Sequence, residues 1–83
     1  MKKISKEKLM ELVISNIKDV KIQKINENQD FVELGMDSIG FIHLILAIEE
    51  EIGRELPDQY LILAEMNTVE KLYNVISLEG DDE

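Results

Sequence analysis

The fold of this chain is decided by the stretch Asp30-Phe31-Val32-Glu33-Leu34-Gly35-Met36-Asp37-Ser38-Ile39. The segment that follows is apolar and continues to about Ile52, and the next residue, Gly53, is a typical helix stop. Asp or Ser just before a run of helical periodicity is typical of a helix N-terminus. We therefore predict a tight turn around Gly35 and a helix that begins at Ser38, with one hydroxyl at their junction.

The composition limits what so small a chain can do. Its 83 residues form one domain with little room for a buried catalytic pocket. The chain has no Cys, which excludes disulfides, zinc knuckles and thiol nucleophiles from the protein itself. These properties favour a docking or carrying module, and we expect neither a catalytic residue nor a metal site.

The charge indicates the class of partner. Eighteen acidic against nine basic residues give a formal net charge of −9. Such an excess repels nucleic-acid phosphates and anionic lipids and attracts basic protein surfaces. Seven of the nine basic residues lie in the first 24 positions, and no apolar run follows Met1-Lys2-Lys3. We expect a cytoplasmic monomer whose partners are proteins, with no nucleic acid and no membrane among them.

Helical spacing of apolar residues predicts an all-α fold, a small four-helix bundle of three main helices and one short one. The first helix is expected to run from the N-cap Ser5 to about Ile17. A long loop, residues 18–37, follows it, and we expect this loop to be packed by its own apolar side chains.

Two further helices are expected after the central one. Asp58 is predicted to cap a short helix over residues 59–64. The last helix is expected to begin at Asn67 or Thr68, because Asn67-x-x-Glu70 approximates a capping box. We assign residues 1–78 to the domain and expect residues 79–83 to form an acidic, disordered tail.

The central helix carries more apolar residues than one buried face needs. On a helical wheel a core stripe of about 100° is formed by Phe41, Leu44, Ile45, Ile48 and Ile52. We expect Ile45, Ile48 and Ile52 in the core with Phe31, Leu12 and Val69. A second strip, made of Ile39, Ile42 and Leu46 and bordered by His43, Glu49 and Glu50, lies on the other side of Ser38. Because so small a domain cannot easily bury both strips, we predict that the second is partly exposed and serves for docking. Cover by the last helix or the long loop is the alternative.

Ser38 has two interpretations from the residues alone. A Ser after Asp at a helix start is ordinarily part of the cap. No hydrolase pattern surrounds it, since G-x-S-x-G is absent and His43 lies about 140° round the helix, too far to act as a base. Ser38 is therefore interpreted either as a cap residue or as the substrate of another enzyme.

The run Phe31-Val32-Glu33-Leu34-Gly35-Met36-Asp37-Ser38-Ile39, with residues 49–52 and 56–58 at the matching distances, resembles the acyl carrier proteins. The resemblance covers nearly the whole chain and implies a four-helix bundle. It implies that Ser38 carries 4′-phosphopantetheine, transferred from coenzyme A by a separate phosphopantetheinyl transferase. The arm's thiol would hold acyl chains as thioesters, and the phosphodiester would lie at a helix N-terminus that favours negative charge.

The same resemblance implies roles for the neighbouring residues. Asp37 would help the transferase to recognise the site, and the partner-facing surface would be formed by Ile39, Ile42, His43, Leu46, Glu49 and Glu50. Its partners would be the transferase and acyl-loading and acyl-processing enzymes with basic docking surfaces.

Two departures favour a specialised fatty-acyl or polyketide-like pathway. Fatty-acid carriers usually have acidic residues at the positions of Gly40 and His43, and the apolar stretch 59–66 is longer here. An aminoacyl, peptidyl or D-alanyl carrier of the same fold remains an alternative, as does an unmodified acidic helical adaptor.

Overall fold

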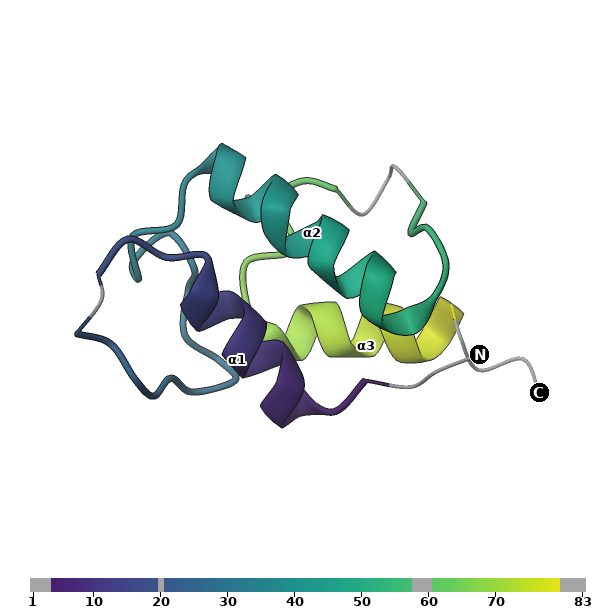
Figure 1. Cartoon of the computed structure of the whole chain (residues 1–83), viewed down its shortest axis with the longest axis horizontal. Coiled ribbons are helices and arrows are strands. Elements are labelled where there is room, and N and C mark those ends of the chain that lie inside the picture. The colour runs from purple at the N-terminus through teal and green to yellow at the C-terminus, as the bar shows by residue number, and fades with distance from the viewer. Residues whose placement is uncertain (1–3, 20, 58–60, 80–83) are drawn as a thin grey trace.

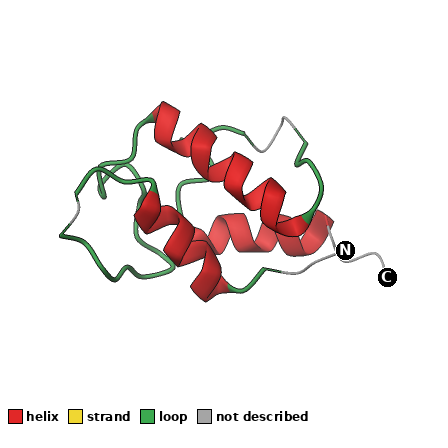
Figure 2. Ribbon diagram, in the orientation of Figure 1, coloured by secondary structure: helices red, strands yellow, loops and turns green. Residues whose placement is uncertain are grey.

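The structure, a computed structural model, describes residues 4–19, 21–57 and 61–79, with the side chains of residues 78 and 79 excepted. Within these residues it contains three helices and no strand: α1 Lys6–Ser15, α2 Ser38–Ile52 and α3 Val69–Glu79. Figure 1 shows α2 above α1 and α3, with the long loop between α1 and α2 at the left-hand end. Figure 2 shows that loops join all three helices. The all-α prediction is confirmed.

The predicted short helix is not confirmed. Leu61 and Ile62 are not helical, and residues 63–65 form a turn that the N–H groups of Glu65 and Met66 close on the Ile62 carbonyl. One such turn gains too few hydrogen bonds to offset the unfavourable nucleation of a helix. Asp58, its predicted cap, and residues 59 and 60 lie outside the described residues.

The first helix begins where the sequence predicts and ends earlier. The Ser5 hydroxyl accepts a hydrogen bond from the Lys8 N–H at 3.0 Å, so Ser5 is the N-cap. The helix ends at Ser15, two residues before Ile17, because the Asn16 side chain turns back and donates to the Leu12 carbonyl at 2.8 Å. Asn readily forms such local bonds, which compete with continuation of the helix.

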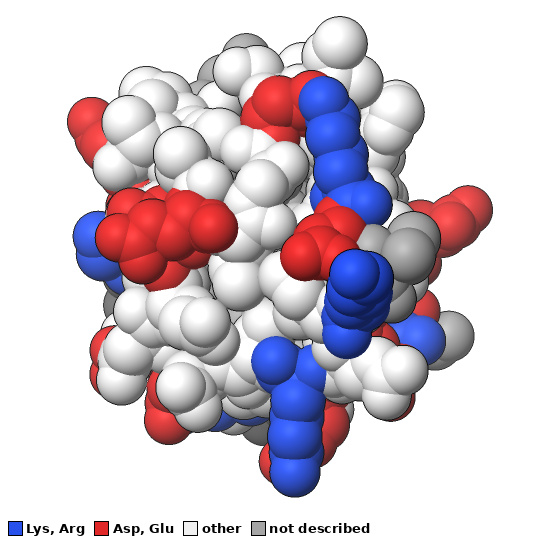
Figure 3. Space-filling view, turned by 90° about the vertical axis from the view of Figure 1, so that its left-hand side faces the viewer, with Lys and Arg blue, Asp and Glu red and all other residues white. Residues whose placement is uncertain are grey.

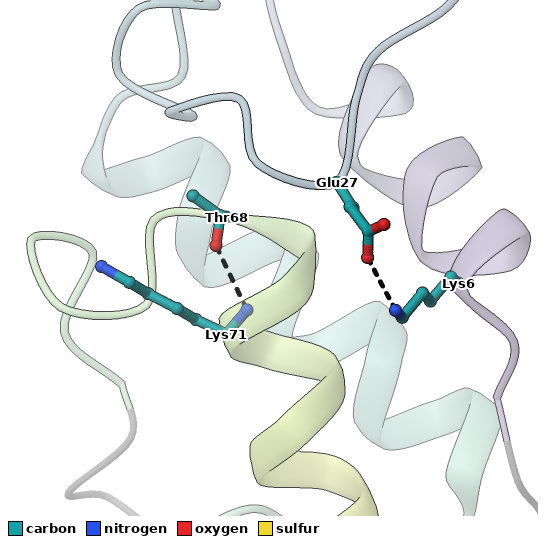
Figure 4. Close-up of polar contacts among 4 residues, drawn as sticks. All are labelled: Lys6, Glu27, Thr68 and Lys71. Atoms are coloured by element: carbon teal, nitrogen blue, oxygen red, sulfur yellow. Dashed lines mark hydrogen bonds and ion pairs between the residues drawn. The ribbon is translucent and has the colours of Figure 1, made fainter.

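The last helix uses Thr68 as its cap. The Thr68 hydroxyl accepts a hydrogen bond from the Lys71 N–H at 3.1 Å (Figure 4). The predicted capping box of Asn67 and Glu70 is wrong, because the Asn67 side chain accepts from the Lys71 ammonium at 3.0 Å instead. The Glu70 N–H is also taken, since it donates to the Glu27 carbonyl of the long loop.

The predicted tail begins inside α3, which includes Glu79, and residues 80–83 lie outside the described residues.

One apolar core joins the three helices, and α1 packs against both α2 and α3. Phe31, Ile45, Ile48, Ile52 and Val69 are buried, as predicted. Leu12 is only half-buried and packs at the edge of the core, where Leu9 and Val13 take the fully buried positions of α1. The central helix is therefore held by its predicted stripe.

The long loop is fastened at both the backbone and the side chains. The Phe31 N–H donates to the Asn67 carbonyl at 2.8 Å, which ties the loop to the start of α3. Lys6 of α1 lies 2.6 Å from the Glu27 carboxylate (Figure 4) and 5.2 Å from the centre of the Tyr73 ring. The hydrogen bond to Glu27 holds the pKa of Lys6 above its ordinary value. These contacts fix the segment that leads into α2.

Candidate functional site

The segment before α2 is folded into successive turns that end at Ser38. The Leu34 N–H donates to the carbonyls of Asp30 and Phe31, and the Gly35 and Met36 N–H groups continue the turns. Gly35 has a φ of 93°, a left-handed conformation that favours glycine. Phe31, Leu34 and Met36 are buried and anchor these turns in the core. The predicted tight turn around Gly35 is confirmed.

Ser38 is the first residue of α2, and its side chain is exposed. The residue before it, Asp37, is the N-cap and accepts a hydrogen bond from the Gly40 N–H at 2.8 Å through Oδ1. Because Asp37 supplies the cap, the Ser38 hydroxyl is not needed for it. An exposed side chain at this position is accessible to another protein.

The other carboxylate oxygen of Asp37 faces a basic side chain. Its Oδ2 lies 3.3 Å from the Lys18 ammonium, which comes from the long loop after α1. The Gly40 N–H, and then Lys18, hold the pKa of Asp37 below its ordinary value of 3.8. Asp37 is therefore ionised at neutral pH and engaged through both oxygens.

The second apolar strip of α2 is exposed, as predicted. Ile39, Ile42 and Leu46 are 65%, 56% and 57% exposed. His43 and Glu50, which border the strip, are exposed as well. The alternative that the last helix or the long loop covers the strip is wrong.

An apolar hollow of about 80 Å³ lies beside this strip. It is lined by Phe41, Ile42, Ile45, Leu46, Glu49 and Leu61. The strip therefore continues from the surface of α2 towards Leu61, which lies in the segment between α2 and α3.

Comparison with known proteins identifies the family of this chain. The family described as "Phosphopantetheine attachment site" matches residues 7–76. The acyl carrier protein of Buchnera aphidicola subsp. Schizaphis graminum is 38% identical over 72 residues, which are 86% of this chain and 89% of that protein. The chain belongs to the acyl carrier proteins. The acyl carrier protein of Zymomonas mobilis subsp. mobilis is 40% identical over 53 residues, 63% of this chain and 67% of that protein. No solved structure gives a significant match.

Membership of this family implies a covalently bound 4′-phosphopantetheine group, and it identifies a carrier that is not itself an enzyme. Acyl carrier proteins interact with a phosphopantetheinyl transferase and with acyl-processing enzymes. No helix among the described residues is long and apolar enough to cross a membrane, and no acidic or His cluster there could hold a metal ion.

The N-terminus of α2 fits the anionic cofactor. The Ser38 side chain is exposed, and the first turn of α2 contains no acidic residue that would repel a phosphate. Unpaired N–H groups and the helix dipole favour negative charge at such a position. The carboxylate of the adjacent Asp37 opposes it, and Lys18 lies 3.3 Å from that carboxylate.

Glu49 has a role in the structure of the carrier that the sequence did not indicate. Its Oε2 accepts a hydrogen bond from the Leu56 N–H at 2.8 Å, and the residue is half-buried. This bond ties the segment after α2 back onto the helix. Glu49 is therefore partly engaged inside the protein, unlike its neighbour Glu50.

Sequence reasoning missed Lys18 as a site residue, and it noted Gly40 only as a difference from fatty-acid carriers, without its packing role. A Cβ at position 40 would lie 2.7 Å from the Asn16 carbonyl oxygen, so glycine allows the end of α1 to approach the first turn of α2. The available signal was weak: a Lys outside a helix, in a chain with few basic residues. Figure 3 shows basic and acidic side chains side by side on the end of the molecule that carries the long loop.

Proposed function

We propose that Ser38 is the residue that carries 4′-phosphopantetheine, and that the chain presents acyl groups on this arm to separate enzymes. The single observation that supports this is the exposed Ser38 side chain at the start of α2, in a chain of this family whose N-cap is supplied by Asp37. In the transfer, the Ser38 oxygen forms a bond to the phosphorus that carries pantetheine, the pyrophosphate linkage of coenzyme A breaks, and the adenosine bisphosphate half of coenzyme A leaves. The hydroxyl proton passes to a base of the transferase.

The arm supplies a chemical group that the chain lacks. The protein contains no Cys, so a thioester requires the terminal thiol of the cofactor. Acyl groups held in this way can be carried between the active sites of other enzymes, and the covalent chemistry takes place at the thiol of the arm and not at a side chain of the protein.

The docking surface we propose is the exposed strip together with its polar border. Ile39, Ile42 and Leu46 offer apolar contact, and the border is formed by His43, Glu49 and Glu50. An exposed apolar patch with a polar border is typical of a protein-binding surface. Asp37, next to Ser38, is the proposed residue for transferase recognition.

We further propose a specialised fatty-acyl or polyketide-like pathway for this carrier. Its support is that positions 40 and 43, acidic in the usual fatty-acid carriers, are Gly and His here. The first acidic residue of α2 is Glu49, so the half of the helix next to Ser38 contains no carboxylate. A partner that recognises acidic groups beside the attachment residue would find none on this helix.

The attachment proposal is tested by intact-mass spectrometry after incubation with coenzyme A and several transferases of different specificity. The wild-type chain and Ser77→Ala, which removes an exposed hydroxyl of α3, should each gain one phosphopantetheine mass. Ser38→Ala should gain none. Modification of Ser38→Ala, or no modification of the wild-type chain by any transferase, would refute the proposal.

The cargo is tested by loading the modified protein with fatty acyl, malonyl and aminoacyl donors. The proposal expects acyl loading. Loading only by an enzyme that activates an amino acid would replace it with an aminoacyl carrier function. Partner binding by the unmodified chain that is indifferent to Ser38→Ala would favour an acidic adaptor.

A further inference from the structure

Lys18 is held next to the attachment turn by the way α1 meets α2. The Asn16 carbonyl oxygen packs against Gly40, where any Cβ would come within 2.7 Å of it. The Asn16 N–H groups are bound back to α1, which fixes the direction of the chain as it leaves the helix. Two residues later, the Lys18 ammonium lies 3.3 Å from Asp37 Oδ2.

The Lys18 ammonium has bonding capacity beyond this one contact. It carries three N–H donors, and among the described residues Asp37 is the one carboxylate within ion-pair distance of it. Asp37 Oδ1 is occupied by the Gly40 N–H. The Lys18 side chain is 79% exposed, so it can move between neighbouring anions with little steric hindrance.

Attachment of the cofactor creates an electrostatic problem at this position. The phosphodiester on Ser38 is an anion, and the preceding residue in the chain is the ionised Asp37, whose pKa is already held low by its hydrogen bond from Gly40 and by Lys18. Two like charges on adjacent residues repel each other, and a cation between or beside them offsets this repulsion by attracting both. Among the described residues, Lys18 is the cation that contacts Asp37.

We propose that the Lys18 ammonium binds the phosphodiester of the 4′-phosphopantetheine group and is shared between it and Asp37. Lys18 thereby orients the first part of the arm and offsets the repulsion between the two anions. Figure 3 shows that basic side chains lie among acidic ones on this end of an otherwise acidic protein. This inference depends on the proposed attachment at Ser38.

The experiment compares the unmodified and modified forms of three proteins: wild type, Lys18→Met and Lys21→Met. Met keeps the length and apolar stem of Lys and removes the charge. Lys21 is an exposed lysine of the same loop with no ion pair to a described residue, so Lys21→Met is the matched control. Intact mass is measured first, to confirm that the modified forms carry the cofactor.

Three readouts follow that do not depend on acyl transfer. In the wild type, modification should shift the side-chain NMR signals of Lys18 and leave those of Lys21 unchanged. The phosphorus NMR signal of the modified protein should move in Lys18→Met and not in Lys21→Met, and raising the salt concentration should bring the wild-type signal towards that of Lys18→Met. Modification should lower the melting midpoint of Lys18→Met by roughly 1 to 6 °C relative to its effect on the wild type, the range expected for an exposed ion pair in a small domain.

The outcomes separate the two proposals. If the wild-type chain is not modified, the attachment at Ser38 fails and this inference fails with it. If the wild type is modified but its Lys18 signals do not move, the inference is refuted while the attachment stands, even where Lys18→Met is a poor transferase substrate. The same phosphorus chemical shift in the modified Lys18→Met and wild-type proteins refutes this inference as well. Lys18 would then contact Asp37 and not the phosphodiester.

Discussion

A pair of substitutions on α2 tests whether its two apolar strips have the different roles that the structure indicates. Ile45 is 4% exposed and Ile42 is 56% exposed, although they lie three residues apart and line the same hollow. Replacing either by Ala removes the same three carbon atoms. The comparison therefore isolates burial from side-chain chemistry.

The expected magnitudes follow from the exposures. At about 0.8 kcal/mol per buried methylene, loss of three carbons from a buried side chain lowers the free energy of unfolding by about 2.4 kcal/mol. The space left behind brings the expected loss for Ile45→Ala to roughly 2–4 kcal/mol. Less than half of the Ile42 side chain is removed from water, so Ile42→Ala should lower the free energy of unfolding by about 1 kcal/mol or less.

Urea unfolding followed by circular dichroism measures both losses, provided that the dependence on urea stays the same in the two variants. Thermal midpoints give an independent value, with Ile45→Ala lower than wild type by roughly 8 to 30 °C. Ile42→Ala should instead slow modification by a transferase, because it removes part of the docking surface. Equal and large losses of stability would show that Ile42 is interior, and the proposed docking strip would then be abandoned.

Three further predictions concern the ends of α2. Glu49→Ala should lower the free energy of unfolding by about 1–2 kcal/mol, because the Leu56 N–H loses its acceptor. The control Glu50→Ala should change the free energy of unfolding little, and equal effects of the two substitutions in urea unfolding would contradict this prediction. Gly53→Ala should lower the free energy of unfolding by about 1 kcal/mol, because Gly53 ends the helix with a φ of 79°, which Ala adopts only with strain. No atom lies within 4 Å of the added Cβ, so no steric clash adds to this loss. An unchanged urea midpoint would show that the helix end relaxes. The pKa of Asp37 is lowered in the folded state, so its contribution to stability is present above pH 3.8 and is lost as the pH falls through the folded pKa. Asp37→Asn keeps an N-cap but should remove that pH dependence of the urea midpoint. An identical pH profile in the two proteins would refute the lowered pKa of Asp37.

The sequence alone was enough to predict the central helix and to tell its buried apolar strip from its exposed one. The bounds of α2, from Ser38 to Ile52, agree with the prediction because Asp37 caps one end and Gly53 closes the other. The strip of Ile39, Ile42 and Leu46 is exposed because the three helices found among the described residues are too few to cover both faces of one helix. Caps and periodicity are local properties, and local properties are readable from sequence.

Tertiary structure alone decided the contacts between segments that are distant in the chain. Lys18 reaches Asp37 only because the Asn16 carbonyl packs against Gly40, and Glu49 is engaged only because the chain returns to it at Leu56. The N-terminal part of α3 lost its predicted capping box because the long loop takes the Glu70 N–H. No periodicity in the sequence encodes these pairings, since each depends on where two separately folded segments meet.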